Sequence, residues 1–153
     1  MSTFAAFKTQ RWRRSTMVSL TAVLAIVIGF AAPVTFSSAA VTTGTGTVSS
    51  TTGSGTNTIT VNLSGVSNAQ NITVTLFNVN DGTNTSSVGV RMGVLLDDVN
   101  GNEFVTGSDV NDSRAQVGVD LTISNFRSDI NTTGFVSGSD VNLTKAQVGT
   151  SLP

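Results

Sequence analysis

The sequence predicts a chain of mixed β and α structure, in which a small antiparallel sheet or partial sandwich precedes a tandem loop–helix unit. Two observations indicate this class. Between residues 58 and 96, apolar residues occupy every second position of several short segments, which is the pattern of strands with one buried face. From residue 98 to 149, one unit recurs with an offset of 31 residues, which indicates duplication of a single supersecondary element.

The duplication is close. The identical stretches are residues 104–105 and 135–136, 107–111 and 138–142, and 115–118 and 146–149. Helices are predicted over residues 108–117 and 139–148, because each stretch ends at a glycine suited to the position after a helix. On each helix two valines lie seven residues apart on one face, with a hydroxyl residue between them. These residues are Val110, Ser113 and Val117, and Val141, Thr144 and Val148.

Each copy opens with twelve residues that read as a calcium loop. Such loops bind through side-chain oxygens at positions 1, 3, 5, 9 and 12 and through the main-chain carbonyl of position 7. In the first copy the ligands are Asp98, Asn100, Asn102, Phe104, Thr106 and Asp109. In the second copy they are Asp129, Asn131, Thr133, Phe135, Ser137 and Asp140. An oxygen-only set suits a hard cation, so we expect two calcium ions, whereas the alternative is that these polar residues only mark two turns.

At these residues the chain resembles the dockerin domain, a pair of calcium-loop-plus-helix units found in secreted polysaccharide-degrading systems. The resemblance covers about 52 residues, roughly the last third of the chain, and rests on the loop pattern, the aspartate at position 12 and the helix that follows. It implies an EF-hand-like arrangement in which the twelve ligand positions hold two calcium ions. It also implies attachment to a cohesin-type protein partner.

The two loops differ at position 6, where Glu103 stands in the first and Gly134 in the second. A side chain there resists the left-handed backbone of the sharp turn at a cost of about 1–2 kcal/mol. Thr133 also replaces the usual acid or amide at position 5. With two ligand carboxylates per loop, we expect dissociation constants of about 10⁻⁴–10⁻³ M, with the second loop filling first.

Other residues of the repeat are assigned to packing or to a partner. Ile123 and Phe126, between the copies, are expected in the shared core together with the rings of Phe104 and Phe135. Leu143 replaces Asp112 of the first copy and lies on the side of its helix away from the valines. It either forms the centre of a docking surface flanked by Lys145 and residues 138–139, or packs against the β-part or the tail at Leu152.

Three strands are predicted from alternation in the β-part. Their inward residues are Ile59, Val61 and Leu63, then Ile72, Val74 and Leu76, then Val88, Val90, Met92 and Val94. Residues 41–58 are rich in Thr, Gly and Ser, which fits either a flexible linker or a partial strand with a mobile tip. The stretch loosely resembles the Ig-like β-modules that precede dockerin-type tails in large secreted bacterial proteins, and so short a sheet is expected to be marginally stable.

The N-terminus has the layout of a secretory signal peptide. A basic region with Lys8 and Arg11 precedes the apolar run 17–32, and Ser38, Ala39 and Ala40 offer a cleavage site. The alternative is a membrane anchor, but an apolar run of about 16 residues is short for a span. The predicted domains are therefore a signal peptide at 1–40, a β-domain at 41–96 and a calcium-binding domain at 97–153. Arg13 and Arg14 leave open whether export uses a twin-arginine signal.

Composition excludes several functions. The chain has no cysteine, histidine or tyrosine, which excludes Cys/His and Ser/His catalysis, and we expect no enzyme activity. After removal of residues 1–40 its net charge would be −5, so we expect no nucleic-acid partner and no integral membrane protein. The hypothesis that follows is a secreted calcium-binding module that attaches to a cohesin-type partner. The alternative is a purely structural, calcium-stabilised end of a secreted or surface protein.

Overall fold

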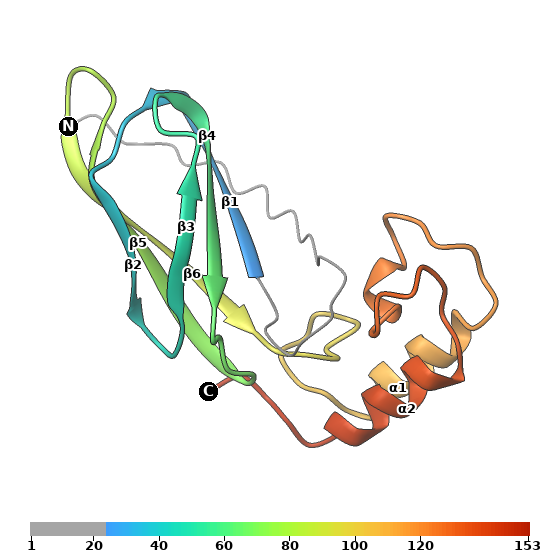
Figure 1. The fold of residues 1–153 in the computed structure, drawn as a ribbon. Coiled ribbons are helices and arrows are strands. Elements are labelled where there is room, and N and C mark those ends of the chain that lie inside the picture. Colours follow the sequence, from blue (N-terminus) through green and yellow to red (C-terminus); the bar gives the residue numbers. More distant parts are fainter. Residues whose placement is uncertain (1–23) are drawn as a thin grey trace. The chain divides into compact units, whose positions relative to one another are not determined.

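The computed structural model describes residues 24–153, which divide into two compact units. Residues 24–67 and 72–92 form the first unit, and residues 68–71 and 93–153 form the second. Six strands precede two α-helices along the described chain (Figure 1). The mixed class with β structure before the helices is therefore confirmed, with the β structure arranged as two small three-stranded sheets. Neither helix, at nine and ten residues, is long enough to cross a bilayer.

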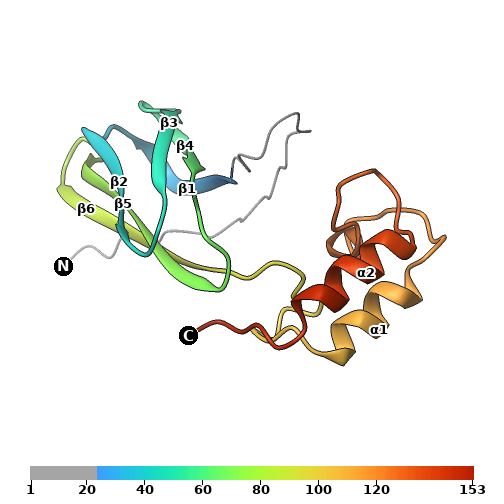
Figure 2. The same ribbon diagram turned by 60° about the horizontal axis from the view of Figure 1, so that its bottom comes forward.

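The sheets are built around two central strands. In one sheet β4 (Thr56–Ser64) lies antiparallel to both β1 (Leu24–Val34) and β3 (Thr47–Thr52). In the other, β5 (Gln70–Asn80) lies between β2 (Ser38–Thr43) and β6 (Thr85–Val94). Figure 2 shows β4 and β5 in different layers of the first unit.

Alternation on the central strands makes the core. The six inward residues predicted for these strands (Ile59, Val61, Leu63, Ile72, Val74 and Leu76) are all completely buried, which confirms those two strands. On β6 the predicted inward residues Val88, Val90 and Met92 are less exposed than their neighbours Gly89 and Arg91. Only Met92 is buried, because β6 is an edge strand. Residues 41–58, predicted as either a linker or a partial strand, contain the end of β2, all of β3 and the start of β4.

The apolar run predicted to belong to a signal peptide lies largely in β1. This strand pairs with β4 from Leu24 opposite Leu63 to Gly29 opposite Thr58, and Ile26, Ile28 and Val34 are buried in the core. β2 begins at Ser38, so cleavage after Ala40 would remove β1 and divide β2. The basic region of the predicted signal peptide lies outside the described residues. The signal peptide remains a prediction, and a leader compatible with this sheet must end before Leu24.

Both α-helices begin with the same cap. Thr106 precedes α1 (Gly107–Ala115) and Ser137 precedes α2 (Gly138–Gln147), and each closes a capping box with the aspartate three residues later. The helices start one residue before the predicted positions and end one or two residues before them. They pack side by side (Figures 1 and 2), and a short 3-10 helix at Phe126–Ser128 lies between them in sequence.

The core of the second unit is smaller than predicted. Val110 and Val141 are buried as expected, and Ser113 and Thr144 between the helices are completely buried. The other apolar residues assigned to this core are exposed, and that assignment is wrong: these are Phe104, Val117, Ile123, Phe126, Phe135 and Val148. The helices end before both valines, and the rings of loop position 7 point outward. Position 8 supplies the missing core residues, Val105 and Val136.

Candidate calcium loops

The carboxylate of Asp98, at position 1, lies at the centre of the first loop. One of its oxygens accepts the backbone N–H groups of Gly101 at 2.9 Å and Asn102 at 3.0 Å, and the other accepts that of Glu103 at 3.0 Å. Three successive N–H groups therefore turn inward toward one charge. The loop folds around an anion that still has acceptor capacity for a cation.

Asp109, at position 12, connects the two ends of the loop and is completely buried. Its Oδ1 accepts the N–H groups of Val99 at 3.0 Å and Asn100 at 3.2 Å. Its Oδ2 accepts the N–H of Thr106 at 2.8 Å and the hydroxyl of the same residue at 3.2 Å. A carboxylate has about four acceptor positions, so the loop's own donors occupy those of Asp109. A direct bond from Asp109 to calcium would have to displace a donor, and the hydroxyl of Thr106 is the one free to rotate.

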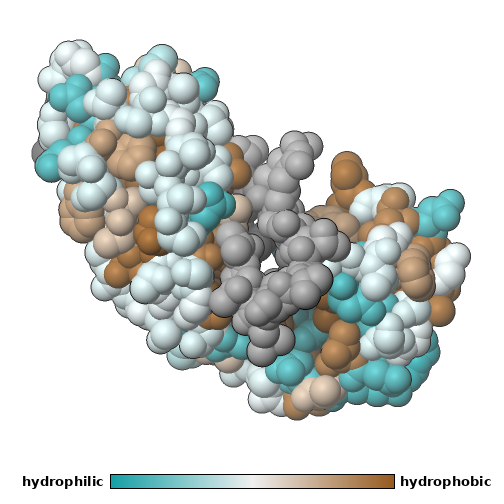
Figure 3. All heavy atoms as spheres, viewed as in Figure 1, coloured by the Kyte–Doolittle hydropathy of each residue, from teal (hydrophilic) through white to brown (hydrophobic). Residues whose placement is uncertain are grey.

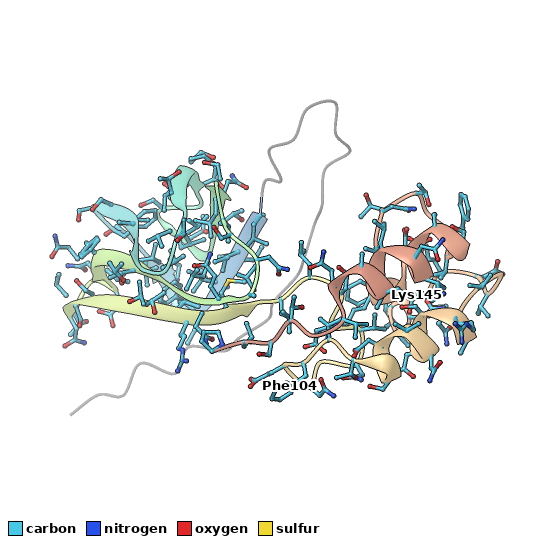
Figure 4. The ribbon with its side chains drawn as sticks, turned by 90° about the horizontal axis from the view of Figure 1, so that it is seen from below. Phe104 and Lys145 are labelled. Carbon is cyan, nitrogen blue, oxygen red and sulfur yellow. The ribbon has the colours of Figure 1, made fainter. Side chains whose placement is uncertain are left out.

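The amides at positions 3 and 5 also orient their oxygens toward the loop backbone. Asn100 Oδ1 accepts the N–H of Asn102 at 3.1 Å, while its Nδ2 donates to the Ser108 hydroxyl at 3.0 Å. Asn102 Oδ1 accepts the N–H of Phe104 at 3.0 Å. The loop thus directs amide oxygens inward. The ring of Phe104 points away from both helices (Figure 4) and is 55% exposed.

The second loop repeats the main bonds of this network, but its position-4 N–H, that of Thr132, donates to the main-chain oxygen of Asp129 at 3.4 Å. Asp129 accepts the N–H groups of Thr133 at 3.0 Å and Gly134 at 2.9 Å. Asp140 accepts those of Asn131 at 3.1 Å and Ser137 at 2.9 Å. As in the first loop, the amide of position 3 donates to the serine of position 11, from Asn131 to Ser139 at 2.9 Å. Equivalent bonds in two separate stretches show that the loop conformation belongs to the repeated unit.

Three of the expected ligand oxygens of the second loop adjoin one another. The Thr133 hydroxyl lies 2.8 Å from Asn131 Oδ1 and 3.3 Å from the Phe135 carbonyl, so positions 3, 5 and 7 adjoin one another. Ligands about 2.4 Å from calcium in a pentagonal bipyramid lie about 2.8–3.4 Å apart. These three oxygens therefore lie at a spacing that a calcium ion could share, which is also the spacing of the hydrogen bonds that the Thr133 hydroxyl donates.

Asp140 is held in its charged form. Burial raises its pKa, but the hydrogen bonds from the N–H groups of Asn131 and Ser137 and from the Ser137 hydroxyl lower it by more, so the pKa lies below the ordinary value. The helix that starts at this residue adds a favourable dipole. A negative charge is thus available in the loop at neutral pH.

Backbone strain is distributed differently from the prediction. Position 6 is left-handed in both loops, with φ of 72° at Glu103 and 92° at Gly134, as expected. Position 4 is left-handed too, with φ of 77° at Gly101 and 57° at Thr132. Each loop therefore has one glycine and one side-chain-bearing residue at its two left-handed positions. Strain confined to the first loop was the reason for expecting the second to fill first, and that reason is wrong.

Each loop contributes two carboxylates, and the rest of its donor set is neutral. Residues 24–153 contain no cluster of three Asp, Glu, His or Cys side chains able to hold a metal ion. Comparisons with models of protein families, with curated proteins and with solved structures found no match.

Proposed function

We propose that residues 97–153 form a calcium-binding module that takes one calcium ion in each loop, in the EF-hand-like arrangement of dockerin domains. The observation that carries this proposal is the repetition of one anion-centred loop network at Asp98 and Asp129. In the second loop, the Thr133 hydroxyl oxygen lies 2.8 Å from Asn131 Oδ1 and 3.3 Å from the Phe135 carbonyl oxygen. Two turns that served only to reverse the chain would not need a second, buried carboxylate in each loop together with amide oxygens directed inward.

Extracellular calcium suits such loops. Two carboxylates per loop correspond to dissociation constants of about 10⁻⁴–10⁻³ M, the range of extracellular modules. A site this weak would stay largely empty in a cytosol and fill outside the cell. This supports the proposal that the protein is secreted, with an export signal that ends before β1.

A docking role is the second part of the proposal. Leu143 on α2 is 43% exposed, and the equivalent residue of α1 is the charged Asp112. Leu143 is followed two residues later by the exposed Lys145, whose place on α2 is seen in Figure 4. Figure 3 shows further apolar atoms on the surface of the second unit. The exposed Leu143 of the second helix is a candidate contact for a cohesin-type partner.

The alternative function is structural, with calcium holding the loops and helices together and no partner involved. It is favoured by the small core of the second unit, in which a buried hydroxyl pair, Ser113 and Thr144, occupies the space between the helices. A core of this size contributes little apolar burial. Calcium would then supply the missing stability by binding only the folded state.

Calorimetric titration of the full chain tests the calcium function. We expect two calcium ions per chain, one in each of the variants Asp98→Asn and Asp129→Asn, and none in the double variant. Asp81→Asn is the matched control, because Asp81 is a half-buried aspartate of the β5–β6 turn, outside both loops, that accepts the N–H groups of Thr83 and Asn84. Stoichiometry that does not change in the single variants would refute the proposed sites.

Capture of a partner from the secreted fraction of the source, with calcium or with chelator, separates docking from the structural alternative. We expect Leu143→Asp to abolish calcium-dependent capture and to keep two calcium ions per chain. Asn142→Asp, which places the same charge on the exposed neighbour, should keep both properties. Two bound calcium ions with no captured protein would support the structural role instead.

A further inference from the structure

The residues that follow α2 lie as a short strand along the exit of the first loop. The N–H of Gly149 donates to the Val105 carbonyl at 2.9 Å, and the N–H of Val105 donates back to the Thr150 carbonyl at 2.9 Å. The N–H of Leu152 donates to the Glu103 carbonyl at 3.1 Å, and Phe104 faces Ser151 as an antiparallel bridge. Residues 149–152 thus pair with positions 6 to 8 of the first loop.

This strand is fixed from its other side. The Leu152 side chain occupies the space beside Gly93, where even a methyl group on the glycine would collide with it. The Asn71 side chain donates to the main-chain oxygen of Pro153 at 3.2 Å. All four residues belong to the second unit. The tail is therefore held at its end as well as at its hydrogen-bonded middle.

The second loop is held by different contacts. The N–H of Gly118, which follows α1, donates to the Val136 carbonyl at 3.2 Å, the counterpart of the bond from Gly149 to Val105. The chain then turns back, because the N–H of Val119 donates to the Gln116 carbonyl at 3.0 Å. Within this loop, the hydroxyl of Thr133 lies against the carbonyl of Phe135.

We propose that residues 150–152 are positioning residues for the first calcium site, and that the second site does not depend on them. The inference rests on the proposed calcium function. A peptide group is planar and trans, so its N–H and C=O point in opposite directions. The bond from the Val105 N–H to Thr150 therefore directs the Phe104 carbonyl, the ligand of position 7, away from the tail and toward the loop.

The same strand explains how Glu103 is tolerated at position 6. Its left-handed backbone, with φ of 72°, is secured on one side by the bond from its N–H to Asp98 and on the other by the bond from Leu152 to its carbonyl. Both peptide groups that flank Phe104 are thus oriented by the tail. Removing the tail leaves the position-7 carbonyl of the first loop to reorient.

Amide NMR during a calcium titration reads the two loops separately. The N–H groups of Gly101 and Gly134 each donate to the position-1 aspartate of their own loop, so each reports on one site. The full chain would be compared with a chain that ends at Gly149 and with two variants. Leu152→Pro lacks the N–H donor to Glu103, and Leu152→Ala keeps it.

We expect the calcium concentration at the midpoint of the Gly101 titration to rise at least fivefold on truncation and at least twofold in Leu152→Pro. The midpoint at Gly134 should stay within twofold throughout, and Leu152→Ala should leave Gly101 within twofold of the full chain.

Equal shifts at both glycines would overturn the inference, because the tail would then serve stability in general. No shift at either glycine, with normal binding in the full chain, would overturn it while leaving the calcium function intact. A full chain in which neither glycine responds to calcium would remove the calcium function and this inference together. A shift confined to Gly101 supports the positioning role.

Discussion

Glu103 and Thr132 hold the left-handed backbone that glycine adopts at the equivalent place of the other loop. The cost of such a conformation is about 1–2 kcal/mol for a residue with a side chain, and it is higher for a β-branched residue such as Thr132. We expect Thr132→Gly and Glu103→Gly each to tighten calcium binding by their own loop, by about 5- to 30-fold if the whole strain is relieved. Gly134→Ala is the converse variant and should weaken the second loop, since the added methyl group would meet no atom within 4 Å and only backbone strain would change. Calcium titration measures the affinity of all three variants. An affinity of the second loop that does not change in Gly134→Ala would contradict the role of backbone strain.

Asp81 is the residue that makes the β5–β6 turn sensitive to acid. Its pKa is lowered by the N–H groups of Asn84 and Thr83, which donate to its carboxylate. A carboxyl group with a lower pKa in the folded state stabilises the fold above its unfolded pKa, and this contribution is lost as the pH falls through the folded pKa. Carbon-13 NMR should show Asp81 titrating below 3.8, the ordinary value, and Asn84→Pro should raise its pKa toward that value. Titration of wild-type Asp81 at 3.8 or above would contradict the contribution of these bonds.

At the scale of the elements, α1 and α2 meet through a pair of buried hydroxyl groups. Ser113 and Thr144 lie 3.3 Å apart, and the Thr144 hydroxyl is also 3.1 Å from the Asp140 carbonyl. Thr144→Val should cost about 1–3 kcal/mol of unfolding free energy, because it leaves a buried hydroxyl without its partner. In the double variant with Ser113→Ala and Thr144→Val, we expect the loss of unfolding free energy to be smaller than the sum of the losses in the two single variants, by about 0.5–1 kcal/mol. Urea denaturation in calcium measures this coupling, and strict additivity would show that the hydroxyl groups do not interact.

The helices themselves should depend on calcium. Each has nine or ten residues, and isolated helices shorter than about 12–15 residues are marginal in water. Their capping boxes include the position-12 aspartates, whose charges repel those of Asp98 and Asp129 when no cation lies between them. We expect circular dichroism to show more helix in millimolar calcium than in chelator, an increase that the Asp98→Asn, Asp129→Asn double variant should lack. Identical spectra for the wild-type chain would contradict calcium-linked folding.

At the scale of the whole molecule, β1 decides whether the β-unit can fold. Ile26, Ile28 and Val34 are buried against β4, and burial of such side chains contributes about 1.5–3 kcal/mol each. The loss of all three side chains from the core would remove a large part of the free energy of unfolding of a small domain, which is about 5–15 kcal/mol. In calorimetry, a chain that begins at Leu24 should show unfolding of both units. A chain that begins at Val41 should lose the transition of the β-unit and keep the calcium-dependent one. Equal melting of the two chains would show that β1 is dispensable, as removal of a signal peptide after Ala40 would require.

Strictly local sequence patterns were sufficient to predict β4, β5 and the starts of both helices. In each of these the alternation or the cap is complete within about ten residues. They did not predict β1, because residues 24–32 were assigned to the apolar run of a signal peptide, which remains a prediction. The pairing of β1 with β4 joins residues far apart in the chain, and no local pattern specifies it. The left-handed position 4 was missed because Thr132 gives no local sign of it, although Gly101 in the other copy did.

The sequence by itself determined the order of β and α structure, the two loops, their candidate ligands and the approximate starts of both helices, because each of these depends on residue types at fixed short spacing. The tertiary structure decided which apolar residues form the core. It buried Val105 and Val136, exposed Phe104 and Ile123, and placed residues 149–152 beside the first loop. Contacts between residues far apart in the chain depend on the fold as a whole, and no local pattern specifies them. The physical reason is that burial and strand pairing are properties of neighbours in space, whereas periodicity and spacing are properties of neighbours in sequence.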